Sequence, residues 1–221
     1  MNKIIKIPKR LLEKVNKDIF ISLSNLFGKK INNHNEIFKY LKKNPEFRSS
    51  IFDLLNMLPA LSFINYEIKN IIEKKFSDNF LVNWTYPQIR LDDIASTKFM
   101  APAHKDRWII NEKKKGYVAW MPLKKDGSSL LVANKDKTKK IVKNNYWGLE
   151  ALGPTNFIRK KINYGEALIF DPDLLHKSDI SKNSRITLQL RYEEMGKYNF
   201  KRTVTQKVDS NILKYWKKKL I

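Results

Sequence analysis

The chain contains no cysteine, which excludes disulfide bonds, thiolate metal sites and a cysteine nucleophile, and which fits a reducing compartment. It also lacks any run of about 18 consecutive apolar residues, so the sequence predicts no transmembrane helix. Residues 1–8 hold no apolar stretch long enough for a signal peptide. We therefore expect a cytoplasmic protein without a membrane span.

Acidic residues are scarce beside basic ones: 22 against 44, for a formal net charge of +22. Two interpretations stay open, an anionic partner such as nucleic acid or a solvated coat of lysines. The lysines form short scattered runs that do not alternate with aromatic residues, as a base-stacking platform would require. This pattern favours the coat and a small-molecule ligand over nucleic acid, and it specifies no oligomeric state.

Only seven glycines and eight prolines interrupt the chain, and 42% of its residues are hydrophobic, enough for one packed domain. Apolar residues recur at helical spacing throughout residues 1–80. We expect one helix that ends at Gly28, a second capped by Asn35 that ends before Pro45, a third that Pro59 interrupts, and a fourth through Phe76.

The pattern changes near residue 81, where short apolar segments separated by turn-rich stretches predict antiparallel strands. The expected strands are 80–86, 88–91, 116–123, 129–133, 166–170 and 185–192, and residues 211–221 have the spacing of a short helix. The prediction is an α+β fold, mainly β, with a sandwich or barrel. It comprises a helical region (1–80), a β core (81–200) and a C-terminal tail or helix (201–221) in one structural domain.

The chain has only three histidines, and two of them suit a metal site. His104 stands two residues before Asp106, and side chains two apart on an extended segment share a face. His176 follows an apolar strand 72 residues later (176 − 104). Two histidines and one carboxylate leave positions open on an octahedral ion, as iron(II) requires for a co-substrate and dioxygen. A His-x-Asp pair arises by chance with a probability of roughly 15%, and the alternative is a surface histidine beside an acid.

A second candidate feature is the strand expected over residues 185–192. Its alternation puts Ile186, Leu188 and Leu190 on one face and four polar residues on the other: Arg185, Thr187, Gln189 and Arg191. The polar face either meets water, as in a half-exposed strand, or lines a barrel and needs a ligand. In the second case the guanidinium of Arg185 suits a carboxylate, and the Thr187 hydroxyl adds a donor.

Four segments in this order resemble a known family. They are Ala-His104-Lys-Asp106, then Gly-Tyr-Val-Ala-Trp120-Met-Pro122-Leu123, then Tyr-Gly165-Glu-Ala-Leu-Ile-Phe170-Asp-Pro-Asp-Leu-Leu-His176-Lys-Ser178, then Ser-Arg185-Ile-Thr187. Over roughly residues 82–195 the chain resembles the iron(II)/2-oxoglutarate-dependent dioxygenases, and among them the phytanoyl-CoA dioxygenase-like branch most.

This resemblance implies a double-stranded β-helix (a jelly-roll barrel) with the helical region packed outside. It implies that His104, Asp106 and His176 are catalytic and bind iron(II), and that Arg185 and Thr187 bind the far carboxylate of 2-oxoglutarate. The expected reaction consumes dioxygen and hydroxylates a C–H bond of a small metabolite or carbohydrate. Halogenation is not expected, because halogenases of this kind lack the carboxylate ligand.

Two further residues follow from the same resemblance, and three from their place beside the metal motif, where the alternative for Trp108 is simple packing. Gln88 and Arg90 match positions where relatives place co-substrate or substrate contacts. Lys105, Arg107 and Trp108 flank the metal motif, and they can line a pocket for an anionic or carbohydrate group. The segment 133–137 departs from the turn that the branch carries there, which leaves the substrate class open.

Two other functions remain as alternatives. Arg185 and Arg191 lie six residues apart, like the paired arginines of AlkB-like nucleic-acid demethylases, and the net charge suits such a partner. The other alternative is a non-catalytic jelly-roll binding module. The third histidine, His34, is expected to be a surface residue rather than a ligand.

Overall fold

The structure is a computed structural model that describes residues 2–84, 88–93, 103–108, 110, 115–133, 140–143, 149–152, 157–179 and 184–195. For residues 108, 140–143 and 149–152 only the backbone is described. The expected C-terminal helix at 211–221 lies outside the described residues, as do parts of the strand expected at 80–86.

Four α-helices occupy the first third of the chain, as the apolar spacing predicts. They are α1 (Lys9–Phe27), α2 (His34–Lys43), α3 (Arg48–Asn56) and α4 (Pro59–Phe76), with a short 3-10 helix η1 (Pro45–Phe47) before α3. Gly28 ends α1 with a left-handed backbone (φ 61°), a conformation that glycine adopts at little cost. Pro59 begins α4 rather than interrupting a helix, because the first helical position needs no N–H donor.

Two antiparallel sheets make up most of the rest. The larger runs in the order β1 (Asn2–Lys6), β9 (Glu166–Phe170), β4 (Gly116–Pro122), β11 (Arg185–Glu194) and β2 (Phe80–Asn83), and β3 (Ile89–Asp92) also pairs with β11. The smaller contains β10 (His176–Ser178), β5 (Ser128–Ala133) and β8 (Phe157–Ile162), and β6 (Lys140–Lys143) pairs with β7 (Leu149–Leu152). The expected α+β class with antiparallel strands is confirmed.

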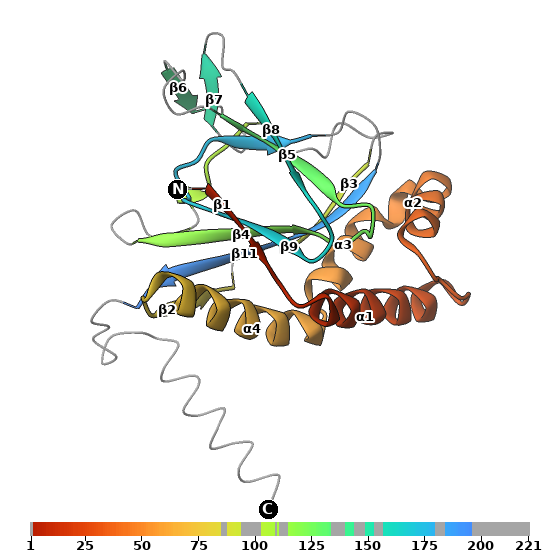
Figure 1. The fold of residues 1–221 in the computed structure, drawn as a ribbon. Coiled ribbons are helices and arrows are strands. Elements are labelled where there is room, and N and C mark those ends of the chain that lie inside the picture. Colours follow the sequence, from red (N-terminus) through yellow and green to blue (C-terminus); the bar gives the residue numbers. More distant parts are fainter. Residues whose placement is uncertain are drawn as a thin grey trace, which may run out of the picture.

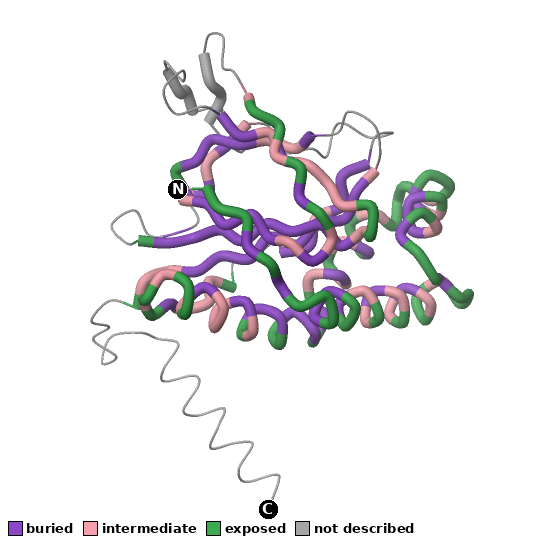
Figure 2. The backbone as a smooth tube through the Cα atoms, in the orientation of Figure 1, coloured by how far each residue is buried: buried purple, intermediate pink, exposed green. Residues whose placement is uncertain are grey.

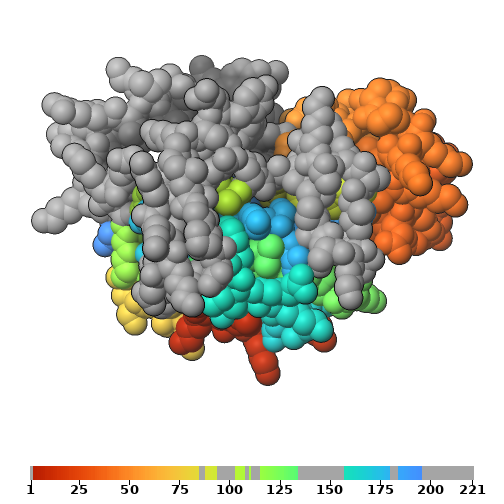
Figure 3. All heavy atoms as spheres, turned by 90° about the horizontal axis from the view of Figure 1, so that it is seen from above, coloured from red at the N-terminus to blue at the C-terminus, as the bar shows by residue number. Residues whose placement is uncertain are grey.

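The elements form three layers, which Figure 1 shows from the side. Helices α1 and α4 cover one face of the larger sheet, and the smaller sheet lies over its other face. Seen from above, α2 and α3 (orange) lie at one side of the molecule (Figure 3). The buried segments run through the sheets and along the inner faces of the helices (Figure 2).

Each face of the larger sheet has its own core. Toward the helices, Ala119 and Met121 of β4 and Leu188 and Leu190 of β11 join one large apolar cluster with the helical side chains. Between the two sheets lies a smaller cluster: Ile110, Val118, Trp120, Leu130, Val132, Ile162, Leu168, Phe170 and Leu174. Alternate residues of one strand therefore enter different cores, as the pleat requires.

Two expectations for the helical region are corrected. Residues 2–6 form an edge strand rather than part of a helix: Ile4 pairs with Leu168 and Ile5 with Ala167. Asn33, and not Asn35, caps α2, because its side-chain oxygen accepts from the Glu36 amide at 3.2 Å. Glu36 in turn accepts from the Asn32 amide at 2.8 Å, so an acid three positions after the cap fixes the helix start.

The described structure also contains strands that the apolar pattern does not reveal: β6, β7, β8 and β10. β8 has the sequence FIRKKI, and most of its side chains are exposed or half-buried. β10 has only three residues. Both strands are held by their pairing with β5, so tertiary contact and not local propensity defines them.

Asn56, at the end of α3, holds strand β3 in place. Its side chain donates to the Ile89 carbonyl at 3.0 Å and accepts from the backbone amides of Gln88 and Ile89, both at 2.7 Å. We expect Asn56→Leu to lower the free energy of unfolding by about 2–4 kcal/mol, because it leaves these backbone groups without their partners. Urea unfolding checks this value. The matched Asn44→Leu, at the end of α2, should cost under about 1 kcal/mol, and an equal loss in both variants would contradict this role of Asn56.

Candidate metal centre

His104, Asp106 and His176 come together although 72 residues separate the histidines. His104 and His176 form an isolated antiparallel bridge, with reciprocal backbone hydrogen bonds of 2.9 and 3.0 Å. Each of the three side chains offers one ligand atom, and these atoms all lie within 4.8 Å of one another. All three residues are buried. The group could therefore hold a metal ion.

Asp106 reaches this group by a different route from the one the spacing predicts. It does not continue an extended segment from His104 but begins a short 3-10 helix, η3 (Asp106–Trp108). The turn carries the carboxylate to within 3.5 Å of His104 Nε2. The three residues meet as expected, and a tight turn, rather than the alternation of a strand, brings the carboxylate in.

The imidazole of His176 is held in the form that a metal ligand needs. Its Nδ1 lies 2.9 Å from the Leu174 carbonyl oxygen, so Nδ1 carries the proton and Nε2 keeps a free lone pair. Burial, helped by the charge of His104, lowers the pKa of His176 to about 4. The ring is therefore neutral at pH 7, and its centroid lies 4.4 Å from that of His104.

The two carboxylate oxygens of Asp106 have different surroundings. Oδ2 accepts from Gln189 Nε2 at 2.6 Å and lies 3.4 Å from Arg191 Nε. Oδ1 accepts no hydrogen bond among the described residues. Burial by itself would raise the pKa of Asp106, but Arg191 and the two histidines together hold it well below the ordinary value. Asp106 is therefore an anion that offers one oxygen to an ion and has the other fixed.

The polar face of β11 is buried and lies between the two sheets. Arg185, Thr187, Gln189 and Arg191 are at most 4% exposed, so the half-exposed strand is the wrong interpretation. Arg191 and Gln189 lie nearest the candidate ligands through Asp106, and Thr187 and Arg185 follow along the same face. The Thr187 hydroxyl has no hydrogen-bond partner in the part of the chain that the structure describes.

Arg185 is already bound to protein groups. Its Nε donates to Asp92 Oδ2 at 2.7 Å, and its Nη1 donates to the carbonyl oxygens of Ser129 and of Asp179, the latter at 3.2 Å. Its guanidinium lies 5.4 Å from the centre of the Trp120 ring. Because Ser129 belongs to β5 and Arg185 to β11, this arginine joins the two sheets.

Gln88 and Arg90, the other expected co-substrate residues, lie in different settings. The Gln88 side chain is buried against α4, where its Oε1 accepts from Asn65 Nδ2 at 2.8 Å, so it serves packing. Arg90 pairs with Thr187 across β3 and β11, and residues directly opposite share a face. Its Nη2 lies 3.5 Å from Asp92 Oδ1. Only Arg90 of these two joins the polar face.

The three expected substrate residues flank the centre. Arg107 binds two acids in the segment that leads to His176, with Nη2 2.8 Å from Asp173 Oδ2 and 3.4 Å from Asp171 Oδ1, and thereby ties the two ligand-bearing segments together. Lys105 is half-buried between two ligands. The Trp108 side chain lies outside the described residues.

His34 is not the surface residue that its place in the helical region suggests. It is buried at the start of α2, and its Nε2 lies 3.0 Å from Asn16 Oδ1. Burial, with a smaller contribution from Lys124, lowers its pKa to about 4. It takes no part in the metal group.

The sequence does not predict the roles of two residues around the centre: Gln189, which supports the candidate ligand Asp106, and Asp92, which binds Arg185 on the polar face. Gln189 was expected only as a member of the polar face, and Asp92 was not singled out at all. The signal for Asp92 is weak but present, because an acid that ends a strand two residues after Arg90 shares a face with it.

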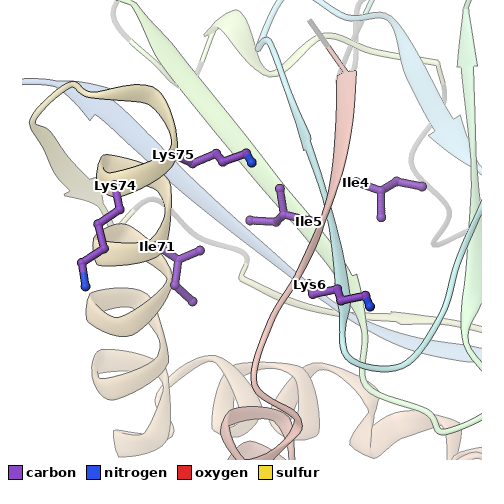
Figure 4. A pocket seen from close by; sticks show the side chains of 6 residues that line it. All are labelled: Ile4, Ile5, Lys6, Ile71, Lys74 and Lys75. Carbon is purple, nitrogen blue, oxygen red and sulfur yellow. The ribbon is translucent and has the colours of Figure 1, made fainter.

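A separate shallow pocket of about 350 Å³ lies between β1 and the end of α4. Ile5 points toward the helix, which contributes Ile71, Lys74 and Lys75 (Figure 4). The pocket shares no residue with the metal group and contains no carboxylate, so it is a distinct feature of the surface.

No protein-family model matches this chain, and no curated protein is similar to it in sequence. Among the residues that the structure describes, no helix is both long and apolar enough to cross a membrane.

The three histidines provide a matched set for testing the metal group. We expect His104→Ala and His176→Ala each to weaken binding of Co²⁺ or Fe²⁺ by about 100-fold or more, since each removes one of three ligands. His34→Gln should leave the affinity unchanged. Calorimetric titration of metal-free protein measures all three, and a comparable loss in His34→Gln would place the metal elsewhere.

The buried histidines also predict how stability depends on pH. With folded pKa values near 4 for His34 and His176, the unfolded chain binds more protons than the folded one as pH falls from about 6.5 to 4. Metal-free protein should therefore lose stability across this window, by up to about 3 kcal/mol for each histidine. Urea unfolding at pH 7.5 and 4.5 tests this, and His34→Gln should show a smaller loss than wild type.

Proposed function

We propose that this protein is an iron(II)- and 2-oxoglutarate-dependent oxygenase that hydroxylates a C–H bond of a small metabolite or carbohydrate. The observation that carries the proposal is one juxtaposition: a buried His104–Asp106–His176 group beside a buried strand face that bears arginines and a hydroxyl with no partner among the described residues. The first feature suits the metal, and the second suits an anionic co-substrate.

The strand order supports a jelly-roll core for the proposed enzyme. The larger sheet contains β3, β11, β4 and β9 in adjacent places, and the smaller contains the His104 bridge, β10, β5 and β8. The order in which the chain passes through these eight segments is the order expected for a double-stranded β-helix, which supports this part of the proposal. In this arrangement both histidines lie on neighbouring segments of the smaller sheet.

The residues of the centre fit iron(II). Two imidazoles and one carboxylate form the facial set that leaves positions open on an octahedral ion, and no soft thiolate is present in the chain. Asp106 Oδ1, buried and without a hydrogen bond among the described residues, is the kind of atom that a bound cation satisfies. With 2-oxoglutarate and dioxygen, the bound metal would supply the oxidation, with succinate and carbon dioxide as co-products.

The charges around the polar face fit a dianion. Arg90, Arg185 and Arg191 share two carboxylates, those of Asp92 and Asp106. Counting these five described side chains alone, the positive charges exceed the negative ones by one, and a divalent metal would add two more. Because an uncompensated buried charge is costly, a ligand with two carboxylates suits this site better than a neutral one.

The protein's own groups have separate functions in this scheme. His176 stays neutral because it is buried, and its bond to the Leu174 carbonyl orients the ring. Gln189 and Arg191 hold Asp106 Oδ2 and so aim Oδ1 at the ion. The apolar cluster between the sheets keeps water from the inner side of the centre.

The paired arginines do not favour a nucleic-acid substrate. Arg185 and Arg191 are 4% and 2% exposed, and each is bound to an aspartate. Neither can reach a phosphate backbone from these positions, so their spacing gives no support to an AlkB-like demethylase. Formation of succinate distinguishes an oxygenase from the other alternative, a non-catalytic jelly-roll binding module.

We expect metal-free protein, mixed anaerobically with Fe²⁺ and 2-oxoglutarate, to develop the weak visible charge-transfer band of an iron-bound 2-oxo acid. His176→Ala should abolish the band, because it removes a metal ligand. His34→Gln should keep it. Absorption spectroscopy measures the band, and circular dichroism verifies that each variant is folded.

The control outcomes separate the alternatives. A folded wild type that binds Fe²⁺ but gives no band at saturating 2-oxoglutarate would reject the co-substrate. A band without oxygen-dependent formation of succinate, in the presence of candidate sugars and anionic metabolites, would favour a binding module.

A further inference from the structure

The pocket between β1 and α4 lies along an open edge of the larger sheet. Strand β1 is the last strand of that sheet, and among the described residues no strand pairs with its outer side. Ile4, Ile5 and Lys6 all line the pocket. Because consecutive side chains of a strand project to opposite faces, a pocket lined by three in a row runs along the edge of the strand rather than over one of its faces.

Two residues of β1 have backbone groups that point away from β9. Ile7 donates its amide to the Gly165 carbonyl at 2.9 Å, in register with the pairs of β1 and β9. Hydrogen-bonded and non-hydrogen-bonded pairs alternate along antiparallel strands. Ile5 therefore bonds to β9, whereas the N–H and C=O groups of Ile4 and Lys6 point outward, to the open edge.

The wall of the pocket opposite this edge is partly apolar and comes from α4. Ile5 points from β1 toward the helix, and Ile71 lies on the side of the helix that faces the strand (Figure 4). Both belong to the surface of the large apolar cluster, because Ile5 is 8% exposed and Ile71 packs against it partly buried. An extended chain in the pocket could therefore pair its backbone with β1 and bury a side chain against these two isoleucines.

The rim of the pocket is positive. Lys6, Lys74 and Lys75 line it and no acid does, and none of the three forms a salt bridge within the described ranges. Glu73, the acid next to them on α4, is already paired with Lys69 at 2.8 Å. Such a rim attracts an acidic partner and repels a second copy of β1, which would bring its own lysines.

The backbone of the edge distinguishes a peptide from other anions. A nucleic acid or an anionic lipid would use the lysines and the apolar wall, but only another extended chain complements a row of alternating N–H donors and C=O acceptors. Lysines on an edge strand ordinarily prevent pairing with other strands. Beside a hollow with an apolar wall, they instead select the charge of the strand that can pair.

We propose that the edge of β1 and the end of α4 form a docking groove for an acidic, extended segment of a partner protein, which adds to the larger sheet as a further strand. The backbone of the segment pairs with Ile4 and Lys6. One apolar side chain packs against Ile5 and Ile71, and its carboxylates lie near the lysines. This inference is independent of the metal centre and of the proposed function. The docking groove consists of Ile4, Ile5, Lys6, Ile71, Lys74 and Lys75.

Fluorescence anisotropy with two labelled seven-residue peptides tests the charge of the partner. One peptide alternates glutamate with valine, and the other alternates lysine with valine. Wild type should bind the acidic peptide at least about 10-fold more tightly. Lys74→Glu combined with Lys75→Glu should weaken this binding by about 10-fold or more. The matched pair Lys42→Glu and Lys43→Glu, exposed in the last turn of α2, should bind as wild type does.

A second pair of variants tests the backbone contacts. Ile4→Pro removes an N–H that points away from β9 and so leaves the pairing of β1 with β9 intact, whereas Ile4→Thr keeps this N–H. Ile4→Pro should bind the acidic peptide about 5-fold more weakly than Ile4→Thr does. Hydrogen exchange gives the same information without a substitution, because the bound peptide should slow exchange of the Ile4 and Lys6 amides by at least about 10-fold.

Three results would overturn the docking groove, with circular dichroism verifying that each variant is folded. Equal binding of both peptides, or binding of neither, would remove the acidic partner. An equal loss in the variant of Lys42 and Lys43 would reduce the effect to overall charge. Unchanged exchange of the Ile4 and Lys6 amides with the acidic peptide bound, or displacement of that peptide by equimolar single-stranded RNA, would assign the lysines to a general anion surface instead of strand addition.

Discussion

Burial of strand β11 on both faces is the constraint on which the rest of the structure depends. Ile186, Leu188, Leu190 and Tyr192 pack toward the helices, and this face needs only apolar partners. The other face carries two arginines, a glutamine and a threonine into the space between the sheets. Each buried polar group needs a partner, and an unpaired charge is far more costly than an unpaired amide. The positions of Asp92 and Asp106 follow from this need.

The same requirement explains the asymmetry of the metal centre. Asp106 neutralises Arg191 and accepts from Gln189 through one oxygen, so this carboxylate serves the fold even without an ion. Its other oxygen accepts no hydrogen bond among the described residues, so it could bind a cation. The charge that stabilises β11 therefore also prepares a ligand, and a substitution of Asp106 should cost stability as well as metal affinity.

The helices contribute to the centre through strand β3. Asn56 binds the backbone of residues 88 and 89, Asn65 binds the Gln88 side chain, and Arg48 donates to the Leu91 carbonyl at 2.8 Å. These contacts hold a short edge strand whose other two residues, Arg90 and Asp92, face the polar interior. The N-terminal helices thus do more than cover the sheet, because they set the position of one arginine beside the site.

The local sequence determined those features of the fold that depend on residues close together in the chain. Periodic apolar residues, Gly28 and the prolines define four helices. Short apolar segments define β4 and β9, and alternation defines β11 with its two faces. The sequence also singled out His104, Asp106 and His176. Only the tertiary structure decided that the polar face is buried, that Asp92 binds Arg185, that Arg107 joins the two ligand segments, and that residues 2–6 and the three-residue β10 are strands. These outcomes depend on partners 44 or more residues away (176 − 132 for β10), and no local pattern encodes which of several arginines a given aspartate will meet.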